Sequence, residues 1–277
     1  MKLDYFSLIS PLPFYVNGVG SIKSPTLREI SKINYYTYQV YLSNLLLDPD
    51  SYYEMIDKTE GAYLCNFTDQ EKDIILRIRN EYMNLDEKSK EDISIYNIMA
   101  FDKFLIDSIL CTLNFFFEDE IIYDTEKRFF VLFSGAIDDN NKKVQTGIIH
   151  ENNYNEIVDI ILQRVNINKK KDEHKNVKVK NKTAERLLKK MQKGSNAVKQ
   201  KEDKKMEIGN LISSISAHSK TLNILNIWDL TIFQLYDQFT RMRYEDSYVM
   251  NSTSVSVWGD KENKFDDTIW FSIINKD

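Results

Sequence analysis

The architecture of the first half of the chain is set by residues 94–117, which read SIYNIMAFDKFLIDSILCTLNFFF. Apolar residues recur there every three or four positions, as they do along one face of an amphipathic helix. The positions that share this spacing are Ile95, Ile98, Met99, Phe101, Leu105, Ile109, Leu113 and Phe116. We therefore predict a single helix from Ser94 to Phe117 at the centre of the first domain.

Shorter helices are predicted on the N-terminal side of this stretch. Residues 3–19 read as an extended arm, and the Ser-Pro pair at 24–25 is typical of a helix start, with serine as the cap. A tyrosine-rich helix is expected over 34–47, because an Asp-Pro pair follows it. A capping box at 68–71 predicts a further helix over 69–84.

On the C-terminal side the hydrophobic period changes from helix to strand. Residues 120–123 and 128–133 flank a polar turn and predict a β-hairpin, to which 144–149 adds a third strand. Helical spacing returns over 153–165. We therefore predict a helical first domain over residues 1–166, with a small hairpin region near 120–149.

The composition favours helix over sheet. Only 8 glycines and 4 prolines occur in 277 residues, so few tight turns are expected. The longest unbroken apolar run, residues 129–133, is far shorter than the roughly 20 residues of a membrane span. The predicted fold class is mainly α, and we expect no membrane segment and an intracellular location.

A lysine-rich strip separates the first domain from the rest. Residues 168–205 hold fifteen Lys and Arg against five Asp and Glu, while the chain as a whole has a net charge of −5. The strip contains no aromatic residue, so it cannot bury enough surface to offset the entropy of ordering. We predict a basic flexible linker over 167–204. Its alternative role is binding nucleic acid through Lys169–Lys205, which rising salt would weaken steeply.

The final part, residues 205–277, is predicted to be a small α-rich lobe. Ile208, Leu211, Ile212 and Ile215 repeat at helical spacing within 204–218. A second helix is expected to open at Asp229-Leu230-Thr231 and to end near Tyr244. Its apolar face comprises Leu230, Phe233, Leu235, Tyr236, Phe239 and Met242. Such a short lobe is small for an independent core.

Residues suited to catalysis or metal binding are scattered. The 3 histidines and 2 cysteines have no partners at ligand spacing, and no nucleotide-binding or nucleophile motif occurs. The acidic pairs Asp138-Asp139 and Asp266-Asp267 lack the second half of a site. We predict no catalytic, cofactor-binding or metal residue and no enzymatic activity. An enzyme without a recognisable motif stays open as another interpretation.

Aromatic residues are the most distinctive feature, with 16 Tyr, 15 Phe and 3 Trp. Tyrosines occupy more than one face of the helix over 34–47, so some of them must be covered by a partner or by the core. Both interpretations stay open. The residues that we predict to contact a partner are Tyr35, Tyr38, Tyr41, Trp228, Phe233, Tyr236 and Trp258.

The two ends of the chain resemble a known family. The N-terminal segment SPTLREI (24–30) precedes the tyrosine-rich helix, and the C-terminal region holds IWDLTIFQLYDQF (227–239) followed by VWGD (257–260). Together with the basic linker, these segments are similar to tail assembly chaperone-type proteins of tailed phages and prophages from low-GC Gram-positive hosts.

This resemblance implies a protein that binds other tail proteins in the host cytoplasm and performs no catalysis. Such chaperones coat the helical tape-measure protein until tail-tube subunits replace them. The expected partner is therefore the tape-measure or tail-tube protein, bound through apolar helix surfaces, with no cofactor. The alternative is a permanent tail or baseplate component of the virion.

Overall fold

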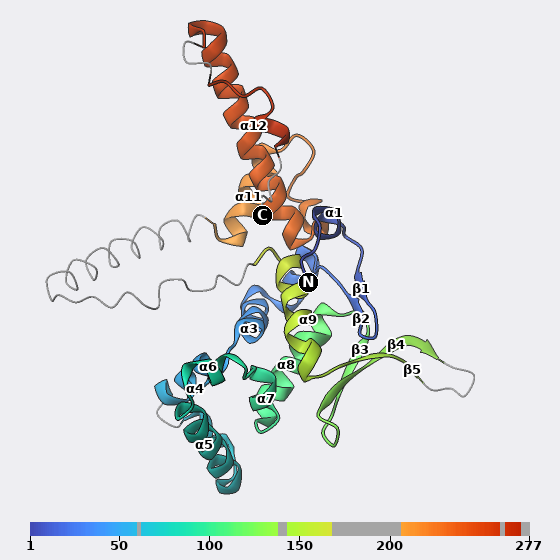
Figure 1. Cartoon of the computed structure of the whole chain (residues 1–277). Helices are drawn as coiled ribbons and strands as arrows, with labels where there is room; N and C mark the ends of the chain where they lie inside the picture. Colours follow the sequence, from blue (N-terminus) through green and yellow to red (C-terminus); the bar gives the residue numbers. More distant parts are fainter. Residues whose placement is uncertain (60–61, 138–142, 168–205, 261–263, 273–277) are drawn as a thin grey trace, which may run out of the picture. The chain divides into compact units, whose positions relative to one another are not determined.

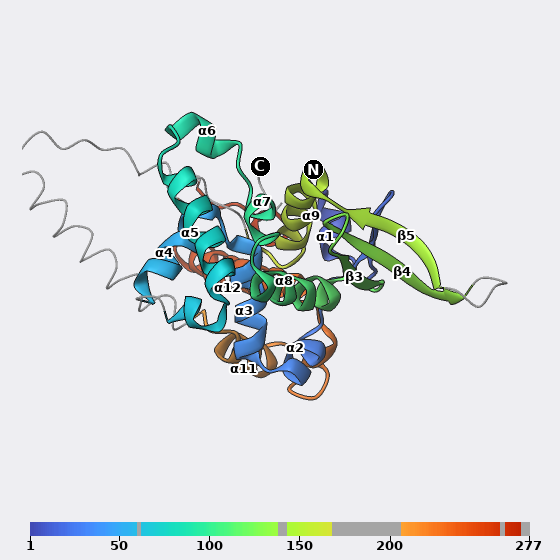
Figure 2. The same cartoon turned by 90° about the horizontal axis from the view of Figure 1, so that it is seen from below.

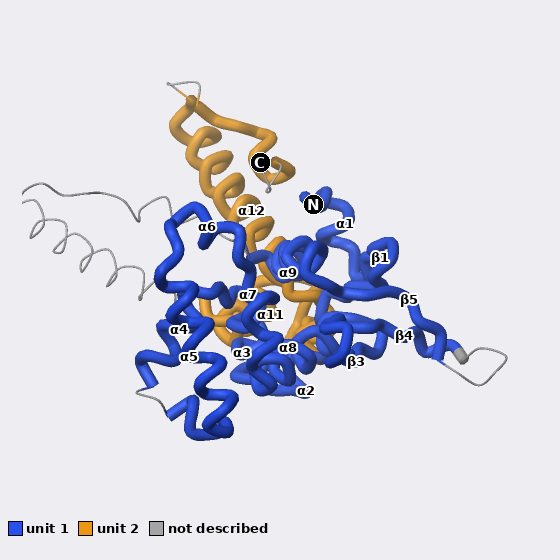
Figure 3. Tube along the Cα trace, turned by 60° about the horizontal axis from the view of Figure 1, so that its bottom comes forward, with its two compact units in different colours: residues 1–25, 29–167 blue, residues 26–28, 168–277 orange. Residues whose placement is uncertain are grey.

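The structure, a computed structural model, describes residues 1–59, 62–137, 143–167, 206–260 and 264–272. It contains two compact units (Figure 3): unit 1 is residues 1–25 and 29–167, and unit 2 is residues 26–28 and 168–277. The described part is mainly helical with two small antiparallel sheets, which confirms the predicted fold class. Apart from Ile167, the predicted linker over 167–204 lies outside the described residues, as do Lys169–Lys205 and Asp138-Asp139. The predicted domain boundaries stay predictions.

The helices of unit 1 begin at side chains that cap their first turns. The helices are α1 (Tyr5–Ile9), α2 (Leu27–Ile33, which starts in unit 2), α3 (Tyr35–Leu46), α4 (Pro49–Lys58), α5 (Asp69–Met83), α6 (Glu87–Glu91), α7 (Ile95–Met99), α8 (Lys103–Phe116), α9 (Glu151–Arg164) and the 3₁₀ helix η1 (Tyr63–Asn66). The capping box of α5 is confirmed, because Thr68 accepts from the Glu71 N–H and Glu71 accepts from the Thr68 N–H. The predicted helix over 34–47 is α3.

The prediction of one helix over Ser94–Phe117 is wrong, because the chain breaks between α7 and α8. Asp102 is fully buried and caps α8 by accepting from the Leu105 N–H at 3.0 Å. It also accepts from the hydroxyls of Tyr52 and Tyr63 at 2.7 and 2.6 Å. Three donors stabilise the buried carboxylate at the break, which outweighs the helical pattern of the flanking apolar residues.

The predicted extended arm over 3–19 is also only partly right. Asp4 accepts from the Ser7 N–H and starts α1, and a short hairpin of β1 (Phe14–Val16) and β2 (Gly20–Ile22) follows. The helix predicted to start at 24–25 begins at Leu27, because Thr26 pairs with Thr231 and the Leu27 N–H donates to the Leu230 carbonyl at 2.9 Å.

The predicted hairpin and third strand are confirmed as one antiparallel sheet in the order β3–β4–β5. Its strands are β3 (Glu120–Asp124), β4 (Phe129–Ile137) and β5 (Lys143–Ile149). Val131 is the partner of Ile122 on one side and of Ile148 on the other. Figures 1 and 2 show β4 and β5 extending well beyond β3. The helix predicted over 153–165 is α9.

The core of unit 1 lies between α3, α8, α9 and the sheet. Helix α8 packs against α3 and β3, and α9 packs against α3 and α7. The most deeply buried apolar side chains include Leu113, Phe116, Phe130, Leu132, Ile149, Ile160 and Ile161. Burial of this apolar surface is the main driving force for folding of the unit.

Arg164, at the end of α9, ties the N-terminal arm to this core. Its side chain is 1% exposed, and its guanidinium donates to the carbonyls of Ser7, Ser10 and Leu12 at 2.9, 3.4 and 2.7 Å. Burial lowers the pKa of Arg164 to about 10. Three carbonyl acceptors thus compensate the desolvation of the charge and fix the path of the arm.

Unit 2 contains two α-helices in its described part, α11 (Ile208–His218) and α12 (Ile232–Trp258), with the 3₁₀ helices η2 (Ile227–Asp229) and η3 (Ile269–Phe271). Helix α11 packs against α12. The segment over 264–272 runs back along α12, because Phe265 lies 5.9 Å from the Tyr248 ring and the Arg241 guanidinium donates to the Ser272 carbonyl at 3.0 Å.

The predicted end of the second helix near Tyr244 is wrong, because α12 continues to Trp258. Gly259, with φ of 75°, ends it. The added turns are rich in serine and threonine, and the hydroxyls of Ser252, Thr253 and Ser256 donate to carbonyls of the same helix. In the described parts of the chain, none of the helices is both long enough and apolar enough to span a bilayer.

Candidate partner-binding site

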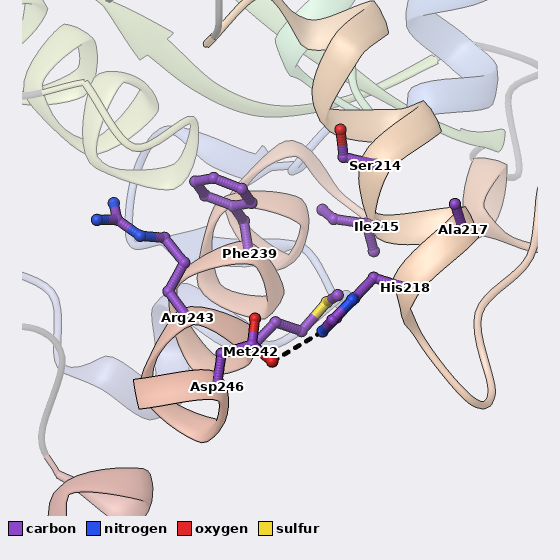
Figure 4. A pocket seen from close by; sticks show the side chains of 8 residues that line it. All are labelled: Ser214, Ile215, Ala217, His218, Phe239, Met242, Arg243 and Asp246. Atoms are coloured by element: carbon purple, nitrogen blue, oxygen red, sulfur yellow. Dashed lines mark hydrogen bonds and ion pairs between the residues drawn. The ribbon is translucent and has the colours of Figure 1, made fainter. Parts of the chain in front are cut away.

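Helices α11 and α12 enclose a pocket with a volume of about 360 Å³ (Figure 4). The lining residues come from two turns of each helix. They are Ser214, Ile215, Ala217 and His218 of α11, and Phe239, Met242, Arg243 and Asp246 of α12. The α12 residues lie three or four positions apart and therefore share one face. The pocket lies wholly within unit 2.

The floor of the pocket is apolar and partly open to solvent. Ile215 is completely buried, whereas Phe239 and Met242 are half-buried and Ala217 is exposed. In Figure 4 the side chains of Ile215, Phe239 and Met242 line the space between the two helices. Such a concave apolar surface favours the binding of an apolar side chain from another molecule.

Charged groups lie at the rim. His218 Nε2 lies 2.9 Å from Asp246 Oδ1, and the side chains of both are about half exposed, at 57% and 50%. The Arg243 guanidinium lies 5.9 Å from the centre of the Phe239 ring. An exposed pair of this kind adds little stability. It joins the end of α11 to α12 and gives the pocket one acidic and one basic edge.

The face of α12 that forms the pocket continues beyond the end of α11. Met250 and Val257 lie four and eleven residues after Asp246, on the same side of the helix, and are 66% and 65% exposed. Val249 and Trp258 flank them and are 53% and 76% exposed. Unit 2 therefore presents an apolar pocket followed by an exposed apolar stripe.

This region is similar in sequence to a known domain family. Residues 199–275 match the family model of the YomV second domain. YomV is a Bacillus phage and prophage protein, so the C-terminal region of this chain is similar to a phage-associated domain. We call residues 199–275 the YomV-like region; it contains α11, α12 and the whole pocket. No curated protein and no solved structure matched the chain.

Four of the predicted contact residues lie in the YomV-like region. Trp258 is 76% exposed on the stripe. Trp228 is half-buried, and its Nε1 donates to the Ile224 carbonyl at 2.8 Å. Tyr236 is half-buried, and Phe233 is only 4% exposed. Phe233 therefore belongs to the core of unit 2 and not to its surface.

The other three predicted contact residues lie on α3 in unit 1. Tyr38 is 2% exposed and packs with its ring 6.2 Å from that of Phe115, so it is a core residue. Tyr41 is half-buried against the same phenylalanine at 5.5 Å, and Tyr35 is 40% exposed. None of the seven predicted residues lines the pocket.

The pocket residues were assigned by the sequence to apolar helix faces but not to a site. The periodicity of α11 and α12 places Ile215, Phe239 and Met242 correctly toward the neighbouring helix. Periodicity gives no indication of where the covering helix ends, because that depends on the packing of α11. The sequence alone therefore could not show which part of the apolar face of α12 is covered by α11 and which part is open.

Catalytic chemistry has little support at this pocket. Ser214, His218 and Asp246 are the residue types of a catalytic triad, but the Ser214 hydroxyl points away from the His218 ring in Figure 4. A nucleophile must lie within hydrogen-bond reach of its base. Across the described residues, no group of three His, Cys, Asp or Glu side chains is placed to hold a metal ion.

A second pocket, of about 530 Å³, lies in unit 1 at the start of α9. His150 caps α9 by accepting from the Asn152 N–H at 3.2 Å, and Asn97 donates to Glu151 at 2.6 Å. Lys127 and Arg128 lie on its edge. His150, Asn97 and Glu151 thus make local contacts at the start of α9, and the apolar pocket of unit 2 is the stronger candidate for binding another protein.

Proposed function

We propose that this protein is an assembly factor of a tailed phage that binds another tail protein, the tape-measure protein being the first candidate. The apolar pocket between α11 and α12 carries this proposal, because it lies in the YomV-like region and is open to solvent. The resemblance of both chain ends to tail assembly chaperones supports the choice of a tail protein. The protein acts in the host cytoplasm by binding alone and catalyses no reaction.

The pocket suits an amphipathic helix of the partner. Recognition of such a helix places one or two large apolar side chains into a groove and leaves the polar face in water. A pocket of about 360 Å³ over Phe239 and Met242 can receive one anchoring side chain. Arg243 and Asp246 at the rim give the bound helix a preferred direction through their opposite charges.

Co-expression with the tape-measure protein of the same phage tests the proposal. We expect the full chain to keep the tape-measure protein soluble and to co-purify with it. Met242→Lys and Ala217→Arg should each abolish co-purification, since both place a charge in the pocket and Ala217 is exposed enough to change without loss of core packing. Asn251→Lys, which adds the same charge at an exposed position outside the pocket, is the matched control.

The same experiment has clear contrary results. Co-purification that survives both pocket variants would show that the pocket is not the binding site. Absence of any association with tail proteins would overturn the proposed function itself. Circular dichroism of each variant shows whether a lost interaction reflects lost folding.

Mass spectrometry of purified virions beside infected-cell lysate separates an assembly factor from a permanent component. An assembly factor is expected in the lysate and absent from the particle. Presence in the particle at a fixed copy number would favour the alternative of a tail or baseplate protein.

A further inference from the structure

The turn between β1 and β2 holds the only Asn-Gly pair in the sequence, Asn17-Gly18. The Val19 N–H donates to the Val16 carbonyl at 3.1 Å and closes the turn, with Asn17 and Gly18 at its two central positions. Both central residues are exposed, and Gly18 has a φ of 72°. Because glycine has no Cβ, its backbone nitrogen can approach the asparagine side chain closely.

The two groups that would react with each other are free of hydrogen bonds. In the described part of the chain, no acceptor is paired with the Gly18 N–H and no partner holds the Asn17 amide. No hydrogen bond therefore has to break before the Gly18 nitrogen reaches Asn17 Cγ. A bond between these two atoms closes a five-membered ring.

We propose that Asn17 is a site of spontaneous deamidation, and that its isoaspartate product changes how the β1–β2 hairpin packs on the sheet. Hydroxide removes the Gly18 amide proton, and the Gly18 nitrogen forms a bond to Asn17 Cγ. The bond between Cγ and Nδ2 breaks, and Nδ2 takes a proton from water and leaves as ammonia. Water then opens the cyclic imide at either of its carbonyls, which leaves aspartate or isoaspartate at position 17.

The isoaspartate product affects the fold because the turn is packed tightly against β5. The Gly18 carbonyl accepts from the Ile148 N–H at 3.1 Å. A Cβ at Gly147 would overlap the carbonyls of Gly18 and Val19, so glycine is required for this close approach. Isoaspartate lengthens the main chain by a carbon atom just before Gly18. The added atom moves the Gly18 carbonyl away from the Ile148 N–H.

Peptide mapping by mass spectrometry of the purified full chain, sampled over days in mildly alkaline buffer, tests the modification. We expect the peptide that contains Asn17 to lose ammonia and gain water, and to do so faster as the pH rises, since hydroxide starts the reaction. Chromatographic retention separates the aspartate product from the isoaspartate product.

The pair Asn251-Ser252 is the control within the same chain. Asn251 is also exposed, but Ser252 has a Cβ and lies inside α12, where each N–H donates to the carbonyl four residues earlier. Ring closure there first requires the helix to open locally. We therefore expect deamidation at Asn251 to be at least about tenfold slower than at Asn17.

The variant Asn17→Gln separates the chemistry from its structural consequence. Glutamine keeps a side-chain amide but would have to close a larger ring, so no ammonia loss is expected at this position. In aged wild-type protein the Ile148 N–H should lose its protection from hydrogen exchange, and in aged Asn17→Gln it should keep it. Circular dichroism of both freshly purified chains shows whether they share the same fold before incubation.

Two results would overturn the inference. An unmodified Asn17 after incubation, or deamidation there no faster than at Asn251, removes the site. Conversion to isoaspartate without faster exchange of the Ile148 N–H removes the consequence for the hairpin. Both measurements are made without any phage partner, so they are independent of the proposed function.

Discussion

At the scale of single residues, the neighbours Tyr52 and Tyr53 show how the core treats polar groups. Both are completely buried. The Tyr52 hydroxyl donates to Asp102 at 2.7 Å, whereas the Tyr53 hydroxyl has no hydrogen-bond partner in the described structure. The two side chains are therefore equally buried, but only the Tyr52 hydroxyl is hydrogen-bonded.

This difference predicts opposite effects of removing each hydroxyl. Tyr52→Phe should lower the free energy of unfolding of unit 1 by about 1–3 kcal/mol, because Asp102 loses a buried donor. Tyr53→Phe should leave it unchanged or raise it. Urea unfolding followed by far-UV circular dichroism measures both variants. Equal decreases in the free energy of unfolding for the two variants would contradict the hydrogen-bond assignment.

The burial of Tyr53 also predicts that the free energy of unfolding depends on pH. Burial raises the pKa of Tyr53 to about 12, above its ordinary value of 10.0. Between these values the unfolded chain has lost the phenolic proton and the folded chain has kept it, so the free energy of unfolding falls as pH rises. Tyr53→Phe should reduce this slope by up to about 1.4 kcal/mol per pH unit. Urea titrations at several pH values from 9 to 12 measure it, and an unchanged slope would refute the shift.

Sequence reasoning reached few of these residues. Asp102 stands between apolar residues in a helical pattern, so nothing in its sequence context separates a buried cap from an exposed side chain. Its partners Tyr52 and Tyr63 lie about fifty and forty residues away in sequence, respectively, and only the folded chain brings their hydroxyls to it.

At the scale of elements, local signals predicted most of the structure. The capping box at Thr68, the tyrosine-rich helix α3 and the sheet β3–β4–β5 follow from patterns within a few residues. Two of the errors, the break at Asp102 and the length of α12, come from a buried polar network and from turns without regular apolar spacing. Neither feature leaves a periodic signal.

The start of α12 provides a prediction at this scale. Thr231 is fully buried, accepts from the Gln234 N–H at 3.2 Å and completes a capping box with that residue. Thr231→Ala should lower the free energy of unfolding of unit 2 by about 1–2 kcal/mol. All three tryptophans lie in unit 2, so their fluorescence follows this transition.

A control for that measurement is Thr221→Ala. Thr221 is exposed and outside the helices, and its replacement should change the transition by less than about 0.5 kcal/mol. If both alanine variants gave the same loss, the cap would not be what stabilises the start of α12.

At the scale of the whole molecule, three residues from the N-terminal part of the chain belong to unit 2. Thr26 pairs with Thr231, the Leu27 N–H donates to the Leu230 carbonyl, and Arg28 forms an ion pair of 2.7 Å with Asp229. The fold of unit 2 thus depends on a segment about 200 positions away in sequence from its helices. No local pattern predicts such a contact.

Replacing the buried residue of this segment should destabilise unit 2. Leu27 is 2% exposed, and Leu27→Ala should lower the tryptophan-reported free energy of unfolding by about 2–3 kcal/mol. Arg28→Ala removes only an exposed ion pair and should cost less than about 1 kcal/mol. A tryptophan transition that does not respond to Leu27→Ala would show that unit 2 folds without this segment.

Function at this scale was only partly accessible from the sequence. The resemblance to phage proteins agrees with the YomV-like region at residues 199–275. The contact residues were chosen for aromatic character, and the core buries two of them, Tyr38 and Phe233. Large aromatic side chains stabilise a core as well as an interface, so composition alone cannot separate the two roles.

Titration calorimetry of the purified full chain with purified helical segments of the tape-measure protein tests whether the apolar pocket binds a tail protein. We predict one segment that binds with a Kd varying less than about threefold between low and high salt, because apolar contacts are weakly screened. Met242→Lys should abolish this binding and Asn251→Lys should preserve it. Failure of every segment to bind, or binding that weakens steeply with salt and persists in Met242→Lys, would contradict the account.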